Sequence, residues 1–535
     1  MPAVPLLFNA FVNDLVDYMD HDGIGIPDGP NNQTMPRRLR LLMFADDVVL
    51  VADSRDALQR ACTAFTRWAD DNEMQVGIKK CGAMWIGGER PDGTAPLLLQ
   101  GAAVPEVASY TYLRIALDDH LRPSTMTRYR AQRGNAALHA LRPTLGNAHL
   151  PVAMRVMLIK SILLPILTYG AELLPSAFAD AAPLQRVANH ALATVLQVHH
   201  RYHPVAHEVM TTELNVPLVA TVMRTARQRA LHKWPQLRTW AAAIIKATPA
   251  AIPRAWRRRS WIAQSRRVCG AIRRQLDDHP DVAGSLPRKL TTLRLHAQGL
   301  RRTSARRYLS LWPRILRQAP ERALPELSAH WPNMAAALQA LMRARTGIFT
   351  SSSTLFHMGV LPDIDGACPL CRDGADTLTH MVLHCETLAT TRHEAGILRP
   401  PDSTFVVTRE REATLMAELL GGQLTSGTDK NATALSRPVA ALSAQVDTQG
   451  ESATEARGAR VDGATDHDDT RDGGATTLGP VLPSPRAEGA LRVAAFLLRA
   501  RQLRQASITR TRREYHIPVR RSIRRGPRGP TTTPI

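Results

Sequence analysis

The sequence predicts an α+β protein, with short antiparallel strands near the N-terminus and helices through most of the remaining chain. Two strand-length apolar runs flank a pair of adjacent carboxylates between residues 41 and 51. Apolar side chains then recur at helical spacing from residue 126 to about 345, with few strand-like alternations. Three cysteines and a histidine gather between residues 346 and 400, which indicates a small metal-stabilised module.

Length and charge set the broad class. The 535 residues are enough for about three domains, and the formal net charge of +21 predicts an anionic polymer as the partner. Six cysteines are too few for a disulfide scaffold, so we expect a reducing compartment, nuclear or cytoplasmic. The most apolar run, Ser161 to Ala171, is shorter than the roughly twenty residues that cross a bilayer. The N-terminus lacks the features of a signal peptide, so we expect a soluble intracellular protein with no membrane partner.

The stretch from Leu41 to Val51 predicts a tight β-hairpin with Asp46 and Asp47 at its tip. Its arms are rich in β-formers and suit a sheet that is buried on at least one face. Adjacent carboxylates repel each other unless a cation lies nearby, and Mg²⁺ takes carboxylate oxygens together with substrate phosphates. The pattern therefore favours metal-assisted phosphoryl transfer. A solvated Asp-Asp turn in an unrelated sheet is the alternative.

Other elements of a mixed α/β region surround this hairpin. Pro5 to Tyr18 predicts a helix with a broad apolar face. Ser54 is a suitable N-cap for a second helix, which places Cys62 on its core face. Met74 to Ile78 and Ala83 to Ile86 predict two short strands joined by a Lys-Lys-Cys link.

Residues 126 to about 345 predict a helix-rich region. One apolar segment runs from Ala153 to Leu167 and is expected to bend at Pro165. A second segment repeats its apolar residues at helical spacing, namely Leu184, Val187, Ala188, Ala191, Leu192 and Val195.

Most of the basic charge lies in residues 221–320, which contain 23 Lys and Arg residues against 3 Asp and Glu residues. Fixed cations neutralise phosphates, and the tryptophans of the same region have rings that stack on unpaired bases. We therefore expect a nucleic-acid surface here, with a solvated basic face as the alternative. The densest run of cations comprises Arg254, Arg257, Arg258 and Arg259.

The cysteines and histidine form the pattern C-x2-C-x8-H-x4-C, from Cys368 and Cys371 to His380 and Cys385. Two thiolates on a tight turn and a His/Cys pair about one helical turn apart are able to complete a tetrahedral Zn²⁺ site. His384 is an alternative fourth ligand. A thioredoxin-like CxxC is the competing interpretation, but no βαβ pattern surrounds it. With every position filled by protein, a structural and nucleic-acid-binding role is expected.

The residues Phe44-Ala45-Asp46-Asp47 and their apolar arms resemble the catalytic hairpin of reverse transcriptases from non-LTR (LINE-like) retrotransposons. Pro5 to Asn9 and Phe11 to Leu15 are similar to the segment just upstream of that hairpin. The CCHC motif, with its lead-in at Leu341 to Gly359, resembles the zinc-binding module that follows many of these enzymes. The resemblance covers roughly residues 4 to 400.

This resemblance implies an RNA-directed DNA polymerase that binds an RNA template and a DNA primer or target. It implies Mg²⁺ or Mn²⁺ at the palm, with Asp46 as main ligand and Asp47 as its partner. It also implies that Phe44, Ala45 and Lys80 contact the nucleotide. The Lys80 ammonium would stabilise charge on the leaving pyrophosphate. A solvated loop lysine is the alternative.

The chain departs from the family pattern in two places. Tyr110 to Leu117 resembles the strand that grips the primer end, but Arg114 replaces a glycine. We expect an arginine there to prevent positive φ and close backbone approach. The family's fingers, an earlier metal-binding Asp and a Gln-Gly motif lie upstream of the segment at which this chain begins. We therefore expect an incomplete polymerase that is inactive by itself, and the alternative is a non-catalytic nucleic-acid-binding remnant.

These features predict five regions. Residues 1–125 form a partial palm, the C-terminal half of a right-hand polymerase palm with an antiparallel sheet and helices. Residues 126–345 form a helical thumb and connection with the basic patch, and residues 346–400 form the CCHC module. Residues 401–485 are a mostly disordered linker, and residues 486–535 are a basic helix and tail.

Overall fold

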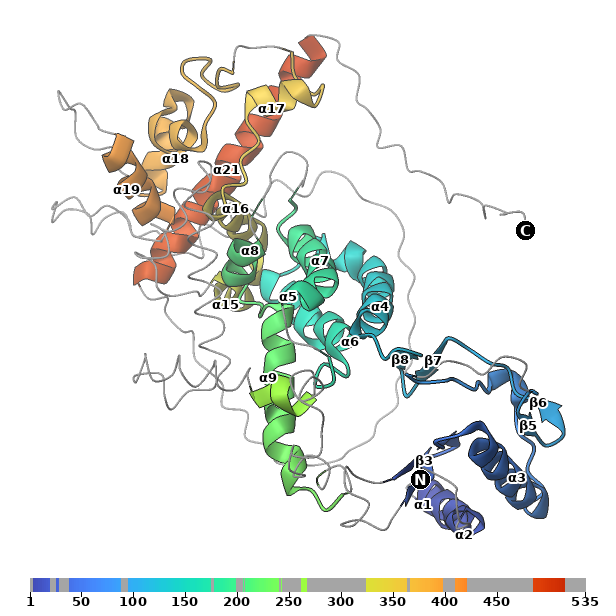
Figure 1. Cartoon of the computed structure of the whole chain (residues 1–535). Coiled ribbons are helices and arrows are strands. Elements are labelled where there is room, and N and C mark those ends of the chain that lie inside the picture. The colour runs from blue at the N-terminus through green and yellow to red at the C-terminus, as the bar shows by residue number, and fades with distance from the viewer. Residues whose placement is uncertain are drawn as a thin grey trace, which may run out of the picture. The chain divides into compact units, whose positions relative to one another are not determined.

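The computed structural model describes residues 3–19, 26–27, 38–87, 95–174, 178–198, 205, 207–239, 242, 261–266, 324–362, 366–397, 409–420 and 485–514. In these ranges the protein is mixed α/β and mostly helical, with small antiparallel sheets (Figure 1). The chain divides into two compact units. Unit 1 comprises residues 1–138, 162–188 and 217–293, and unit 2 comprises residues 139–161, 189–216 and 294–535.

The strands of unit 1 pair only two at a time. Each pair is antiparallel, and among the described strands none joins a third, so the larger sheet expected for a polymerase palm is not seen there. The pairs are β1 Ile26–Pro27 with β2 Arg38–Leu39, β3 Leu41–Phe44 with β4 Asp47–Leu50, β5 Leu98–Leu99 with β6 Ala102–Ala103, and β7 Ser109–Tyr112 with β8 Ile115–Asp118.

The predicted hairpin is confirmed by the pairing of β3 with β4, in which Phe44 lies opposite Asp47 and Leu41 opposite Leu50. Residues two apart in a strand share a face, so the apolar residues at alternate positions lie together. This face of the ribbon packs on helices. These helices are α1 Ala3–Phe11, η1 Val12–Asp14, α2 Leu15–Tyr18 and α3 Arg55–Asp71. Their shared core contains Val12, Leu15, Met19, Ala61, Ala64, Trp68 and Ala69, with Leu41, Met43, Val48 and Leu50 of the hairpin against it.

Helix α3 supports the hairpin on one side and the β5–β6 pair on the other. Ser54 is its N-cap, as predicted, and accepts a hydrogen bond from the backbone N–H of Ala57 at 3.3 Å. Cys62 is buried in the second core, with Ala83, Leu97 and Leu99. Cys62 is therefore a core residue, as expected from its place in the helical pattern.

The prediction of two short strands at residues 74–78 and 83–86 is wrong. Ile78–Lys80 forms a 3-10 turn, η2, and only Ala83 makes an isolated bridge, to Glu106. The Gln100 side chain explains the first difference. Its amide oxygen accepts from the Val76 N–H at 2.8 Å, and its amide nitrogen donates to the Met74 carbonyl at 2.9 Å. A side chain therefore satisfies backbone groups that would otherwise pair with another strand.

The expectation that Arg114 prevents positive φ is also wrong. Leu113 and Arg114 join β7 to β8 with φ values of 46° and 62°. Positive φ at both central residues suits the twist of a two-residue hairpin and normally favours Asn or Gly. Two side chains hold this turn, since Arg130 donates to the Arg114 carbonyl and the Tyr169 hydroxyl donates to the Leu113 carbonyl at 3.2 Å.

The predicted helical region is confirmed where it is described. A run of helix contains α5 Val152–Leu158, the π-turn η3 Ile159–Leu163 and α6 Leu164–Thr168, so the predicted irregularity precedes Pro165. Proline lacks an N–H and crowds the preceding turn, which favours the wider π-turn. The other helices to residue 236 are α4 Pro123–Leu145, α7 Phe178–Val195, α8 His207–Glu213, α9 Val219–Lys233 and η4 Trp234–Gln236.

A buried arginine organises the interior of unit 2. The Arg155 guanidinium is fully buried and donates to the carbonyls of Leu145, Leu150 and Val195 and to the Gln339 side chain. Burial lowers the pKa of Arg155 to about 10. Its hydrogen bonds satisfy the carbonyls of Leu145 and Val195 at the C-terminal ends of α4 and α7, and the Gln339 side-chain amide also donates to the Val195 carbonyl at 2.9 Å.

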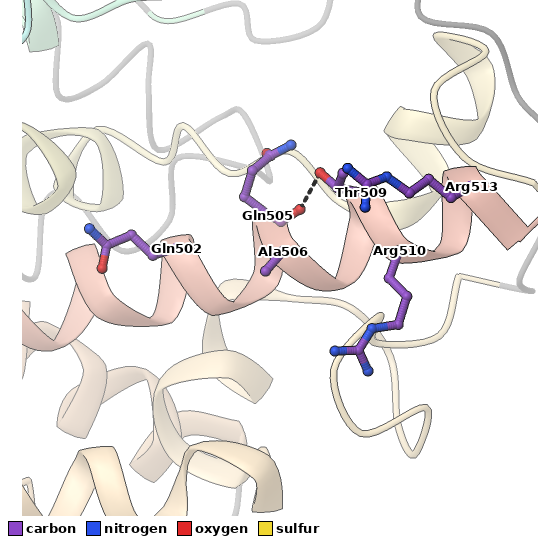
Figure 2. A pocket seen from close by; sticks show the side chains of 6 residues that line it. All are labelled: Gln502, Gln505, Ala506, Thr509, Arg510 and Arg513. Atoms are coloured by element: carbon purple, nitrogen blue, oxygen red, sulfur yellow. Dashed lines mark hydrogen bonds between the residues drawn. The ribbon is translucent and has the colours of Figure 1, made fainter. Parts of the chain in front are cut away.

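Unit 2 also contains the longest described helix, α21, which spans Pro485–Glu514 and occupies the first part of the region predicted as a basic helix and tail, residues 486–535. α21 packs along α16 and also contacts α18 and α19. Its exposed side carries Gln502, Arg510 and Arg513 (Figure 2). The remaining helices that the structure describes after residue 320 are α15 Leu324–His330, η8 Pro332–Met334, α16 Ala335–Arg345, α17 Ser352–His357, η9 His380–His384, η10 Glu386–Leu388, α18 Ala389–Glu394 and α19 Arg409–Leu420.

Two further points concern the predicted regions. Helix α19 lies within the stretch that the sequence assigned to a linker, and residues 401–408 and 421–484 lie outside the described residues. None of the described helices combines the length and the apolar character needed to span a bilayer.

Candidate metal centre and acidic hairpin

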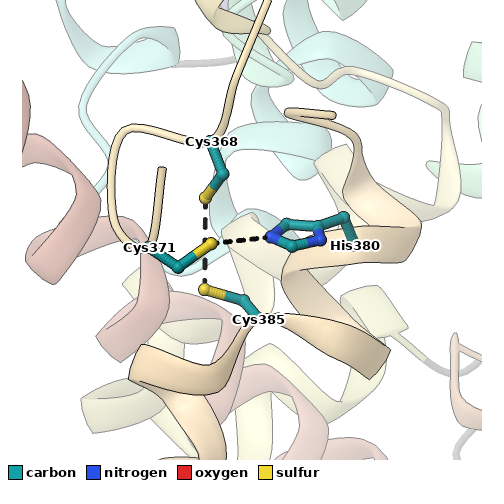
Figure 3. Close-up of side chains that lie close together, drawn as sticks. All are labelled: Cys368, Cys371, His380 and Cys385. Atoms are coloured by element: carbon teal, nitrogen blue, oxygen red, sulfur yellow. Dashed lines mark hydrogen bonds between the residues drawn. The ribbon is translucent and has the colours of Figure 1, made fainter. Parts of the chain in front are cut away.

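The structure brings the four predicted zinc ligands together. One ligand atom from each of Cys368, Cys371, His380 and Cys385 lies within 4.8 Å of the other three (Figure 3). Cys371 Sγ is 3.2 Å from His380 Nε2, and Cys368 Sγ is 4.0 Å from Cys385 Sγ. With Zn–S bonds of about 2.3 Å, the ligands of a tetrahedral site are separated by roughly 3.5–3.8 Å. The spacing fits a tetrahedral metal ion such as zinc.

A glycine and a tight turn position the first two cysteines. The Arg372 N–H donates to the Cys368 carbonyl at 2.9 Å, and the Cys368 N–H donates to the Gly374 carbonyl at 3.0 Å. Arg372 has φ 59° and Gly374 has φ 86°. A Cβ at residue 374 would lie 3.1 Å from the His380 ring. Glycine is therefore required there both by its backbone conformation and by the close imidazole.

A π-turn positions the other two ligands. In η9 the Cys385 N–H donates to the His380 carbonyl at 2.8 Å, a separation of five residues. The wider turn places His380 and Cys385 on the same side of the helix. The alternative ligand His384 lies outside the cluster, and its Nε2 is 2.9 Å from the carboxylate of Glu412 on α19.

The electrostatics of the cluster favour a bound cation. Burial raises the pKa of the Cys368 thiol, and burial together with the neighbouring Cys368 and Cys371 thiols raises the pKa of Cys385 to about 12. Burial also lowers the pKa of His380, so the imidazole is neutral and able to bind a metal. Three neighbouring thiolates need a compensating positive charge. With all four positions supplied by protein, the donor set fits structural zinc.

The knuckle of the cluster, residues 366–376, is fastened to α21. The Ser507 hydroxyl donates to the Pro369 carbonyl at 2.5 Å. The buried Asp376 carboxylate accepts from the Ser352 N–H and from the Arg504 guanidinium, which also donates to the Thr350 carbonyl at 2.7 Å. The Asp376 side chain is only 1% exposed and that of Arg504 11% exposed, so this ion pair is shielded from water. The contacts fix the register of α21 on the knuckle.

The acidic hairpin presents its carboxylates to solvent. Ala45 and Asp46 form the turn, with Ala45 at φ 52°, and Asp47 is the first residue of β4. Asp46, Asp47 and Phe44 are exposed, and within the described ranges neither carboxylate forms an ion pair. No third metal-ligating side chain joins them among the described residues. The site is thus an open pair of acids on a short ribbon.

Strand β7 is joined by a hydrogen bond to the turn that carries Lys80, and one of its tyrosines responds to the charge of the hairpin. Burial and then the charge of Asp47 raise the pKa of Tyr112. The Tyr110 hydroxyl, two residues earlier, donates to the Lys80 carbonyl at 2.7 Å. The Lys80 side chain is exposed and forms no hydrogen bond with Asp46 or Asp47 in the described part of the chain.

The predicted basic run Arg254, Arg257, Arg258 and Arg259 lies outside the described residues. Two groups that hold the metal module were not predicted from the sequence, namely Asp376 and its partner Arg504. They are 128 residues apart, and no local spacing pattern relates them.

Comparison with known proteins adds no relative: no protein-family model matches the chain, and no curated protein matches it.

Proposed function

We propose that the chain is part of a retrotransposon reverse transcriptase, an RNA-directed DNA polymerase of the LINE-like class. The observation that carries the proposal is the β3–β4 hairpin, which exposes Asp46 and Asp47 without an ion-pair partner, among the described residues, at a two-residue turn. Two adjacent carboxylates that lack an ion-pair partner, held on a packed ribbon, suit the binding of a divalent cation. The likeness of the residues around the turn to a polymerase hairpin supplies the choice of reaction.

Within this proposal Asp46 is the main ligand of Mg²⁺ or Mn²⁺ and Asp47 its partner. When bound, the ion would neutralise negative charge on the phosphates of a nucleoside triphosphate. The ribbon keeps the two carboxylates in place because Leu41, Met43, Val48 and Leu50 pack on the α2–α3 core. Phe44 and Ala45 contact the nucleotide beside the metal, and Lys80 contacts its phosphates.

The proposal predicts weak metal binding by this chain. Nucleotidyl transfer with two ions needs more carboxylate ligands than one adjacent pair, and no third ligand joins Asp46 and Asp47 in the described part of the chain. We therefore expect no primer extension on an RNA template by the purified chain. We expect Mn²⁺ to bind at the hairpin only at high micromolar to millimolar concentration.

The test is paramagnetic broadening of amide NMR signals by Mn²⁺ in the zinc-loaded full chain. Broadening should centre on residues 44–48 and increase when a deoxynucleoside triphosphate is present. It should disappear in Asp46→Asn/Asp47→Asn and persist in Asp17→Asn, an exposed acid on α2. Equal broadening in the parent and in the hairpin variant would refute the proposal.

A second candidate function is nucleic-acid binding without catalysis. The net charge of +21 and the closed Cys₃His cluster favour it, since neither feature requires a reacting site. RNA binding should then weaken steeply with added salt, whether or not the hairpin binds metal. Salt-independent binding would contradict this function.

A further inference from the structure

The outward side of α21 forms a continuous polar face that the sequence did not reveal. Six residues line a hollow of about 570 Å³ along the helix (Figure 2). They follow one another at helical spacing, so they share one side of α21. They are Gln502, Gln505, Ala506, Thr509, Arg510 and Arg513. We call this set the 502–513 face.

The chemistry of the 502–513 face does not suit a small apolar ligand. Pockets for such ligands are lined mainly by hydrophobic and aromatic side chains. Among the described residues of the lining Ala506 is the only apolar one, and the rest carry two guanidinium groups, two primary amides and a hydroxyl. The Thr509 hydroxyl donates to the Gln505 carbonyl at 2.9 Å. The face therefore offers mainly cationic and amide donors to a ligand.

Its cations are available and suitably spaced. Arg510 and Arg513 are exposed, and no acidic residue lines the hollow within the described part of the chain. Residues three apart on a helix have Cβ atoms about 5–6 Å apart, which suits contacts with neighbouring phosphates of one strand. From Gln502 to Arg513 the helix rises by roughly 16 Å, enough to follow several nucleotides.

The opposite side of the same helix segment is held in place. Ile508 and Thr511 are buried, while Arg504 and Ser507 make the polar contacts with the metal knuckle. The 502–513 face is therefore presented on a fixed support, and little ordering is needed when a ligand binds.

We propose that the 502–513 face of α21 binds the sugar–phosphate backbone of a nucleic-acid strand, with Arg510 and Arg513 on phosphates and Gln502 and Gln505 on neighbouring sugar or base groups. The proposal rests on the second function above, nucleic-acid binding, and assigns it to a surface. Phosphate contacts do not distinguish RNA from DNA, whereas contacts with the 2′-hydroxyl do.

The test is fluorescence anisotropy of the zinc-loaded full chain with a labelled single-stranded 20-mer, as RNA and as DNA, over a range of KCl concentrations. Arg510→Glu/Arg513→Glu should weaken binding at least tenfold at low salt. Arg510→Ala/Arg513→Ala should weaken it less and reduce the slope of log affinity against log salt by about 2, since each lost phosphate contact removes about one. Circular dichroism and zinc content verify that each variant is folded.

The matched control is Arg128→Glu/Arg142→Glu, which changes the net charge by the same amount at two exposed arginines of α4. We expect the control to bind within about threefold of the parent. If both α21 variants bind like the parent, or if the control loses as much affinity as the charge-reversal variant, the assignment of this face is wrong. Failure of the parent to bind either 20-mer at low salt would instead overturn nucleic-acid binding itself.

Discussion

The metal centre and the acidic hairpin are both built from short sequence motifs, but one is closed and the other open. Cys368, Cys371, His380 and Cys385 place four ligand atoms within 4.8 Å of one another, and the cluster is partly buried. Asp46 and Asp47 are exposed and have no third ligand among the described residues. A structural metal site is completed by nearby residues, whereas a reacting site leaves positions for substrate and depends on groups from elsewhere.

The two regions also differ in what their functional residues contribute to stability. The cluster is partly buried in unit 2, and its knuckle is tied to α21 by polar contacts. The hairpin carboxylates are outside the core that holds their ribbon. Substitutions should therefore unfold the first region and leave the second intact.

The largest effect is expected from Cys385→Ser. Loss of one thiolate from a closed four-ligand site should abolish stoichiometric zinc binding and, because metal binding is coupled to folding, destabilise the module by several kcal/mol. Metal analysis after dialysis, with thermal unfolding, measures both. Cys81→Ser, a half-exposed cysteine outside the cluster, should retain zinc. One equivalent of tightly bound zinc in Cys385→Ser would show that the site is not closed by this residue.

A smaller effect is expected from Asp376→Asn, which breaks the buried pair with Arg504. Loss of the charged partner of the Arg504 guanidinium should lower the free energy of unfolding by about 3–5 kcal/mol. Hydrogen exchange of the amides of residues 500–512 should accelerate accordingly. The control is Glu488→Gln, which removes a more exposed i,i+4 partner of Arg492 and should cost about 0–1 kcal/mol. If the amides of residues 500–512 exchanged equally slowly in both variants, Asp376 would not be a residue that holds α21 in place.

A pH dependence should distinguish a paired acid in unit 1 from the unpaired acids of the hairpin. Burial alone would raise the pKa of Asp118, but hydrogen bonds from the Arg122 N–H and guanidinium and from the Thr125 hydroxyl lower it to about 2. The folded protein therefore binds fewer protons than the unfolded chain between about pH 2 and pH 4. Stability should be lost as the pH falls through this window.

The measurement compares denaturant unfolding of the parent and of Asp118→Asn from pH 5 to pH 2. The difference between them should shrink toward low pH. A constant difference would mean that the carboxylate charge of Asp118 does not stabilise the fold.

The smallest effect is expected from Asp46→Asn/Asp47→Asn. Because both side chains are exposed and without an ion-pair partner among the described residues, the free energy of unfolding should change by less than about 0.5 kcal/mol. A small gain is consistent with relief of repulsion between adjacent carboxylates. Denaturant unfolding measures the change. A loss above about 2 kcal/mol would show that the acids belong to the fold and not to an open site.

Local patterns were sufficient for the elements that local chemistry determines. The hairpin, the capped helix α3 and the spacing of the four metal ligands follow from alternation, an N-cap serine and the Cys/His separations. These features depend on residues within about twenty positions of one another. They required no knowledge of the tertiary fold.

Features that depend on distant side chains were missed. The amide of Gln100 replaces the predicted strand pairing at residues 74–78, and Arg130 and Tyr169 hold the Leu113–Arg114 turn in a conformation that the sequence did not favour. The fastening of α21 by Asp376 likewise joins residues 128 positions apart. Tertiary hydrogen bonds of this kind override local propensity and leave no periodic signal.

The packing of α21 has a practical consequence for anyone who expresses the protein. Leu491, Phe496 and Leu497 are interior residues of unit 2, although they lie in the last tenth of the chain. A product that stops before residue 485 would leave the apolar surface of α16 without its cover and should aggregate or be degraded. A tag or fusion partner that interrupts residues 485–514 should have the same effect.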